Sequence, residues 1–152
     1  MDPVERIVFF ENYSNDSVKI YMAIPNYWIY LTSYPDTFLP RASSFKNPNY
    51  MDNSLVYPPH SRIEVLRTVE KENDFFHDVL PHDTLSFFVI SNDTIRKYGY
   101  DTVAKENNIL VRYDLSIPDM KAMGYNFYYP PIPAMKNVKM CPIYETFLNN
   151  KD

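Results

Sequence analysis

Glycine is almost missing from this sequence: among 152 residues, only Gly99 and Gly124 occur. Phosphate-binding loops, dinucleotide fingerprints and nucleophile elbows each need several glycines at fixed spacing, because their backbone must approach a ligand closely or turn with positive φ. Both glycines here follow short segments of helical pattern, where glycine is typical of a helix C-terminus. The sequence therefore excludes the commonest nucleotide-binding and acyl-transfer motifs, and we expect no cofactor.

Cysteine, basic clusters and long apolar runs are also scarce. Cys141 is the only cysteine, so neither an intramolecular disulfide nor a multi-cysteine zinc site can form. The net charge is −4 and the largest basic cluster is Lys136 with Lys139, which argues against a nucleic-acid partner. No long apolar stretch follows a basic start, so we expect no membrane span and no signal peptide. This predicts a cytoplasmic protein, or an extracytoplasmic one if a leader has been removed.

Aromatic residues and proline are abundant instead. The aromatic fraction is 16%, from 14 Tyr, 10 Phe and one Trp, and there are 13 Pro. Aromatic side chains suit pleated, half-buried surfaces, whereas proline is confined to turns, edges and extended connections. The composition predicts a sheet-rich fold with many turns, and the length fits a single domain over residues 1–152.

Alternation of apolar residues with period two predicts the strands. Residues 85–90 are nearly all apolar, which indicates a central strand covered on both faces. Residues 6–13 and 18–24 flank the turn-like segment Ser14 to Ser17, and this arrangement predicts an antiparallel pair. Other strands are predicted over residues 27–31, 62–66, 109–115 and 125–129.

Short helices are predicted between these strands. Ser91 or Asn92 caps a helix that runs to Tyr98, and residues 116–119 resemble a capping box at the start of a second one. Further helical turns are expected over residues 72–80 and 101–106. The predicted fold is a mainly β, antiparallel β-sandwich with short helices in the connections. The alternative is an α+β domain with the helices on one sheet face, and residues 130–152 are expected to form an extended, proline-rich C-terminal segment.

Few residues have the pattern of a reactive site. His77 and His82 each precede an aspartate, but five residues on a helix correspond to about 140° of rotation, so the two imidazoles do not share a face as metal ligands would. His60 lies in a predicted loop, and Cys141 has no neighbouring histidine to activate its thiol. Arg112 and Asp114 are expected to form an ion pair on a sheet surface. We therefore assign no catalytic or metal-binding residue.

Two aromatic clusters are the best candidates for a binding surface. Flat rings in a row on a sheet can stack on sugars or anchor a protein partner, although such rings more often pack inside the sheet. The candidate binding face consists of Trp28, Tyr30, Tyr125, Phe127 and Tyr129. Its predicted partner is a protein or a carbohydrate.

Several segments resemble one family of small proteins. They are residues 83–90 with 93–98, residues 108–116 continuing to 130, and the shorter segments 12–17 and 34–37. In these segments the chain is similar to uncharacterised proteins of gut Bacteroidetes. The resemblance implies an exported or lipid-anchored protein and no assigned activity.

A non-enzymatic binding or protein-interaction module is the function that the sequence favours. This hypothesis rests on the missing catalytic motifs and the many aromatic residues, and it requires an exposed apolar patch. A hydrolase of unrecognised type is one alternative, and it requires a histidine beside carboxylates or Cys141 in a pocket. A structural subunit of an oligomer is the other, and it requires a large symmetric interface.

Overall fold

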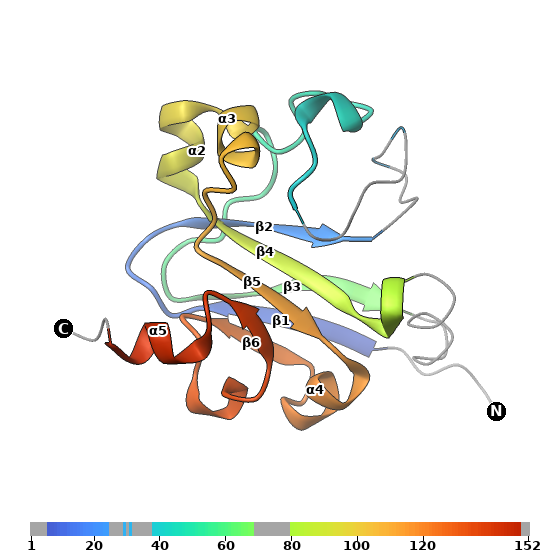
Figure 1. Ribbon diagram of the computed structural model, residues 1–152, viewed down its shortest axis with the longest axis vertical. Helices are drawn as coiled ribbons and strands as arrows, with labels where there is room; N and C mark the ends of the chain where they lie inside the picture. The colour runs from blue at the N-terminus through green and yellow to red at the C-terminus, as the bar shows by residue number, and fades with distance from the viewer. Residues whose placement is uncertain (1–5, 25–28, 30, 32–37, 69–79, 150–152) are drawn as a thin grey trace.

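A computed structural model describes residues 6–24, 29, 31, 38–68 and 80–149 of the chain. Within these residues seven strands form two sheets, one with the strand order β3-β1-β6 and the other with the order β2-β4-β5-β7 (Figure 1). The strands are β1 (Arg6–Asn12), β2 (Val18–Ala23), β3 (Ser61–Thr68), β4 (Leu85–Ser91), β5 (Val111–Leu115), β6 (Asn126–Tyr129) and β7 (Lys139–Cys141). The helices are α2 (Asn92–Tyr98), α3 (Tyr100–Lys105), α4 (Ile117–Ala122) and α5 (Tyr144–Asn149).

Strand β4 lies between β2 and β5 and is covered on both faces, as its apolar sequence predicts. Leu85, Phe87 and Val89 belong to a cluster shared with the three-stranded sheet. Phe88 and Ile90 belong to a second cluster beneath α2 and α3. Because successive side chains of a strand point to opposite faces, one continuous apolar run supplies both clusters.

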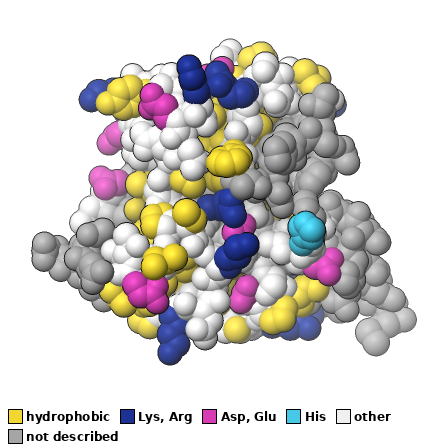
Figure 2. Space-filling model, in the orientation of Figure 1, with side chains coloured by type: hydrophobic (Ala, Val, Ile, Leu, Met, Phe, Trp, Pro, Cys, Tyr) yellow, Lys and Arg dark blue, Asp and Glu magenta, His cyan; other side chains and the backbone are white. Residues whose placement is uncertain are grey.

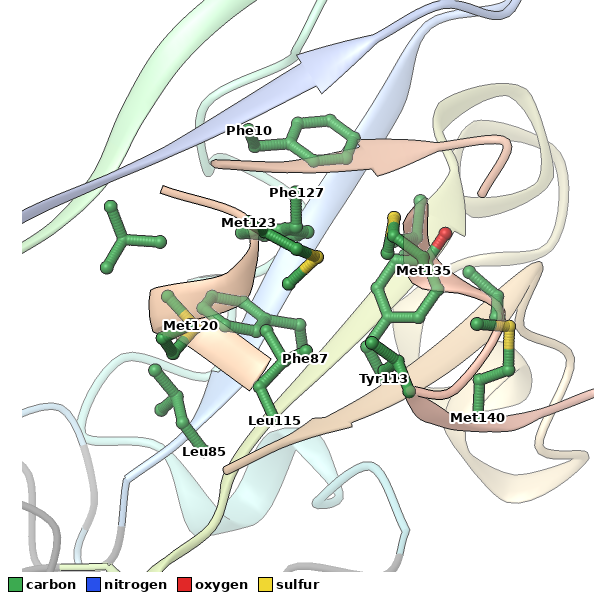
Figure 3. Packing of buried hydrophobic residues seen from close by; sticks show 14 of the residues in the cluster. Phe10, Leu85, Phe87, Tyr113, Leu115, Met120, Met123, Phe127, Met135 and Met140 are labelled. Carbon is green, nitrogen blue, oxygen red and sulfur yellow. The ribbon is translucent and has the colours of Figure 1, made fainter. Parts of the chain in front are cut away.

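The cluster between the two sheets is built around aromatic rings (Figure 3). Phe127 of β6 lies 4.2 Å from the Phe87 ring and 5.1 Å from the Phe10 ring, measured between centroids. Methionines fill the remaining space, among them Met120 from α4 and Met135, both with at most 1% exposure. A flexible thioether adapts to gaps that rigid rings leave, so this combination closes the interior.

The opposite face of the four-stranded sheet is covered by α2, α3 and the segment 39–51. Tyr100 of α3 is 2% exposed and its phenol donates a hydrogen bond of 2.7 Å to the carbonyl of Pro40. Phe45 contacts both Tyr21 and Tyr100 edge-on. The structure therefore combines two predicted arrangements: two sheets that share a core, and short helices on one face of a sheet.

Two pairings differ from the sequence-based expectation. Strands β1 and β2 do not pair with each other, because β1 pairs with β3 and β6 while β2 pairs with β4. The segment between them crosses from one sheet to the other, and the buried Asn12 amide holds it by donating to the carbonyls of Asp16, Tyr57 and Pro58. Strand β6 runs parallel to β1, so only the four-stranded sheet is antiparallel throughout.

Local capping signals are confirmed. The Ser91 hydroxyl accepts from the Thr94 amide at the start of α2, and Gly99, with φ of +83°, follows its end. Ser116 and Asp119 form a reciprocal capping box at the start of α4. These interactions satisfy amides that have no partner within the helix.

Predictions for three other segments have different outcomes. The expected strand over 27–31 and the expected helix over 72–80 lie largely outside the described residues. Segment 130–152 was expected to be extended, but it contains the edge strand β7 and the helix α5. Pro130, Pro131 and Pro133 precede β7, and Pro142 precedes α5. None of these prolines lies inside α5, so they do not prevent that helix.

Candidate functional site: an apolar groove beside helix α5

The three described residues of the predicted aromatic face, Tyr125, Phe127 and Tyr129, do not form one surface. Trp28 and Tyr30 lie outside the described residues. Phe127 is 0% exposed and lies inside the core, because its face of β6 is directed at the other sheet. Tyr125, with φ of +64°, lies beneath the guanidinium of Arg6, whose Cζ is 5.5 Å from the ring centroid. Tyr129 lines an open cavity.

That cavity is a groove of about 480 Å³ at the end of β6. It is lined by Tyr129 and prolines that follow it, together with Pro142 and residues of α5. The Tyr129 and Phe147 rings, which both line it, meet edge-on with centroids 6.4 Å apart. The volume lies within the range of about 300–1,000 Å³ typical of ligand sites. The full lining is Leu110, Tyr129, Pro130, Pro131, Pro133, Pro142, Tyr144, Thr146, Phe147 and Leu148.

No residue that lines the groove carries a charged side chain. The polar side-chain groups are the hydroxyls of Tyr129, Tyr144 and Thr146, and none of them hydrogen-bonds to another residue in the described part of the chain. An apolar wall with a few hydroxyls can bind by burying apolar surface and can orient a ligand through a small number of hydrogen bonds.

One exposed large hydrophobic residue lines this groove, and a second is next to two lining residues in the sequence. Leu148 lines it and is 43% exposed, and Ile143, between the lining residues Pro142 and Tyr144, is 62% exposed. Figure 2 shows hydrophobic side chains on the side of the molecule that carries α5, with both acidic and basic side chains beside them. A contiguous apolar surface that opens into a groove is typical of a site that another molecule covers.

Acidic groups lie near the groove. Burial raises the pKa of the Tyr129 phenol, and the negative charge of Asp16 raises it further. Asp16 is exposed in the segment between β1 and β2. Glu145 is exposed on α5 between the lining residues Tyr144 and Thr146. Lys136 is also exposed, and its amide donates to the carbonyl of the lining residue Pro133, so charges of both signs lie near the groove.

A second aromatic surface lies on the outer face of the three-stranded sheet. The rings of Tyr13 and Tyr128 stack there with centroids 5.3 Å apart, and the Tyr13 phenol donates a hydrogen bond of 2.7 Å to Glu11. Arg62 lies over the Phe9 ring at 3.7 Å and pairs with Glu11 at 3.3 Å. These rings contact each other or neighbouring charges, so they offer less free apolar area than the groove does.

A smaller pocket of about 190 Å³ lies beside β2, between Met22 and Tyr57. Its volume falls below the usual range for ligand sites. The groove beside α5 is therefore the stronger candidate.

None of the described residues considered for chemistry lines the groove or the smaller pocket. His60 Nε2 lies 3.3 Å from Asn15 Oδ1, and His82 is an exposed residue of the turn before β4, while His77 lies outside the described residues. Neither His60, His82 nor the exposed Cys141 lines the groove or the smaller pocket. Among the residues that the structure describes, no cluster of three or more His, Cys, Asp or Glu side chains could hold a metal ion.

Arg112 and Asp114 do form the predicted ion pair, but it is more buried than a surface pair. Arg112 donates from Nε and Nη2 to Asp114 Oδ2 over 3.1 and 2.9 Å, and the Ser86 hydroxyl donates to Oδ1 over 2.6 Å. Asp114 is 8% exposed. Its carboxylate is satisfied by these partners, so the cluster links β4 to β5 rather than presenting a free acid.

The sequence did not indicate the groove because the residues that line it come from three separate segments of the chain. The prolines from Pro130 to Pro133 predict an extended segment, whereas Tyr144, Phe147 and Leu148 have the spacing of one face of a helix. Proline and aromatic residues near each other in a C-terminal segment could have suggested an apolar surface. Only the fold shows that Leu110 and Tyr129 complete it.

Comparisons with known proteins do not assign this chain to a family. No protein-family model, no curated protein and no solved structure gave a significant match. The resemblance to small proteins of gut Bacteroidetes therefore stays a prediction. No helix among the described residues is long and apolar enough to cross a membrane.

Proposed function

We propose that the protein is a non-enzymatic interaction module that binds a segment of another protein in the groove beside α5. The observation that carries this proposal is an apolar groove of about 480 Å³ whose lining includes Leu148, a large hydrophobic residue that is 43% exposed. Exposed apolar side chains gain free energy when a partner removes them from water, at roughly 25 cal/mol per Å² of buried area.

A protein ligand suits this groove better than a carbohydrate does. A bound sugar buries several hydroxyl groups, and each one left without a hydrogen bond costs about 1–3 kcal/mol. The lining side chains offer only the hydroxyls of Tyr129, Tyr144 and Thr146, with no carboxylate, amide or guanidinium group. Apolar and aromatic side chains of a peptide place fewer such demands on the wall.

The scaffold that presents the groove is proposed to be a β-sandwich of mainly antiparallel strands. The buried cluster shared by the two sheets supports this description, and the parallel pairing of β1 with β6 is its one departure among the described strands. Strands β5, β6 and β7 hold the residues on both sides of the groove at fixed positions. A rigid scaffold lowers the conformational entropy that binding costs.

Selection from a random peptide library tests the proposal. We expect the protein to enrich peptides that bind the wild type but bind Leu148→Glu at least tenfold more weakly, because the carboxylate places a charge against the apolar wall. Glutamate retains good helix propensity, so α5 should persist in this variant. Tyr98→Glu is the matched control, since Tyr98 is a 52% exposed aromatic residue on α2, away from the groove.

The stability of both variants is measured in parallel. Exposed positions change the free energy of unfolding by about 0.5 kcal/mol or less, so both variants should unfold near the wild-type denaturant midpoint. The proposal fails if no peptide is enriched, or if the enriched peptides bind the wild type and Leu148→Glu equally well.

A further inference from the structure

We propose that this protein forms a homodimer in which the edge strand β3 pairs antiparallel with β3 of a second copy. The pairing joins the two three-stranded sheets into one, with the strand order β6-β1-β3-β3′-β1′-β6′, where primes mark the second copy. This contact is independent of the groove beside α5, because β3 and β6 are opposite edges of the sheet and both grooves stay open in the dimer.

The outer edge of β3 presents backbone groups that its own sheet does not use. The Phe9 amide donates to the carbonyl of the residue before β6, so the backbone groups of Phe9 point toward β6 and those of Phe10 point toward β3. Phe10 is the cross-strand partner of Ile63, so the groups of Ile63 face β1 and those of Arg62 and Glu64 face outward. Among the described residues, none hydrogen-bonds to these outward groups. Such an edge is a template for another strand.

A β-bulge limits how much of this edge a partner can follow. Phe9 pairs with Glu64 and Val8 pairs with Leu66, so Val65 is the extra residue of β3. The regular part of the edge is therefore residues 61–64, and a second strand pairs with only a few residues around Ile63.

Charge selects one register for the pair. Arg62 and Glu64 are both exposed, and because they are two residues apart their side chains lie on the same face of the sheet. Two-fold symmetry centred on Arg62 or on Glu64 would place like charges directly opposite each other, which is destabilising. Symmetry centred on Ile63 places each Arg62 opposite Glu64 of the second copy. The same register pairs the outward backbone groups of these two residues with each other.

The side chains at this edge already have defined positions. Arg62 lies over the Phe9 ring at 3.7 Å, and Glu64 accepts a hydrogen bond of 2.6 Å from Arg67. Charged side chains usually keep edge strands apart, but here the two signs alternate and complement a second copy of the same strand. Ile63 is half-buried against the cluster between the sheets, so the two Ile63 side chains meet at the axis and lose further exposure to water.

Sedimentation of the wild-type chain between about 10 µM and 1 mM tests the dimer, because small interfaces belong to weak, transient complexes. We expect the average mass to rise with concentration toward twice that of one chain. Hydrogen exchange of the Arg62 and Glu64 amides should slow in parallel, because each amide then donates across the interface. A chain that stays monomeric up to about 1 mM overturns the proposal, and so does a dimer in which these amides exchange at an unchanged rate.

Charge reversal tests the register. Arg62→Glu leaves two acids on each edge and Glu64→Arg leaves two bases, so each variant alone should associate at least about tenfold more weakly than the wild type. An equimolar mixture of the two variants should recover the association, because every acid then faces a base. Two variants that are folded by circular dichroism but do not associate when mixed would overturn the register.

Arg96→Glu and Glu106→Arg are the matched controls. They make the same two changes of charge at exposed positions on α2 and at the end of α3, away from β3. Each control should associate as the wild type does. An equal loss in the controls would show that net charge, rather than the edge of β3, governs the association, and would overturn the proposal. The exchange rates of the wild type provide a test that does not depend on any variant folding.

Discussion

Lys19 occupies an unusual place for a lysine, because its side chain is buried beneath the helical layer. The residue is 2% exposed, and its ammonium donates hydrogen bonds of 2.7, 2.9 and 3.1 Å to the carbonyls of Met51, Asp52 and Ser54. Burial lowers the pKa of Lys19, and the negative charge of Asp52 opposes that shift. A buried ammonium is tolerated only when it is well paired, and here three carbonyls of one turn pair it. Lys19 therefore ties β2 to residues 51–54.

Replacing Lys19 should destabilise the fold. Lys19→Met keeps the apolar stem but leaves three carbonyls without their donor, so we expect a loss of at least about 1.5–3 kcal/mol in the free energy of unfolding. Guanidinium denaturation measures it, with Lys105→Met as the control because Lys105 is an exposed lysine on α3. Equal denaturation midpoints for the two variants would show that the ammonium contributes no net stability.

Neighbouring residues of β6 should respond very differently to truncation. Phe127 is 0% exposed between Phe87 and Tyr113, so Phe127→Ala should cost about 3–5 kcal/mol. Tyr128 faces outward and stacks on the exposed Tyr13, so Tyr128→Ala should cost about 0.5–1.5 kcal/mol. Urea denaturation of both variants checks the register of β6, and the opposite order of costs would place Tyr128 inside.

At the scale of elements, the helices are too short to be stable alone. Helices α2 to α5 have six or seven residues each, below the length at which an isolated helix is marginal in water. Their stability comes from a few buried side chains, such as Met120 in α4 and Tyr100, Val103 and Ala104 in α3, and from caps such as those of α2 and α4. Losing a cap should therefore affect packing as well as the helix end.

Helix α4 offers the sharpest test of a cap. The Ser116 hydroxyl accepts from the Asp119 amide, while the Asp119 carboxylate accepts from the Ser116 amide at 3.0 Å. Ser116→Ala should lower the free energy of unfolding by about 0.5–2 kcal/mol. Ser43→Ala is the control, because Ser43 is exposed outside any such cap. Thermal and urea denaturation measure the difference, and no difference between the two variants would contradict this role.

At the scale of the whole molecule, buried phenols link stability to alkaline pH. Burial raises the pKa of Tyr57 to about 12 and that of Tyr113 well above its usual value of 10.0. The Tyr113 phenol also donates a hydrogen bond of 2.6 Å to the carbonyl of Tyr128. The folded protein keeps these protons at pH values where the unfolded chain releases them. This contribution is complete below pH 10 and is lost as the pH rises toward the folded-state pKa values.

Above pH 10 the free energy of unfolding should therefore fall. Each such tyrosine contributes a slope of at most about 1.4 kcal/mol per pH unit, the value for a difference of one bound proton. Lys19 has the opposite effect on this pH dependence: because its pKa is lowered in the folded protein, its destabilising effect decreases as the pH rises toward its unfolded-state pKa. Lys19 is a single group, whereas at least two tyrosines lower the free energy of unfolding as the pH rises. Urea denaturation between pH 9 and pH 11 measures the slope, and Tyr57→Phe should reduce it. A slope that stays unchanged in Tyr57→Phe would show that Tyr57 does not titrate on unfolding.

Features set by neighbours along the chain were predictable from the sequence. Period-two alternation located most of the described strands, the long apolar run placed β4 at the centre, and serine and glycine marked the ends of α2 and α4. These signals depend on local backbone geometry and on hydrogen bonds a few residues apart, so a linear pattern contains them.

Packing between distant segments decided the rest. The alternation of β2 and β6 indicated two faces but not how each is covered, and so it revealed neither the burial of Lys19 nor that of Phe127. The parallel pairing of β1 with β6 and the groove formed by residues 110, 129–133 and 142–148 join segments far apart in the chain. Such contacts depend on how the two sheets and the helical layer bury their apolar faces together, which no local pattern specifies.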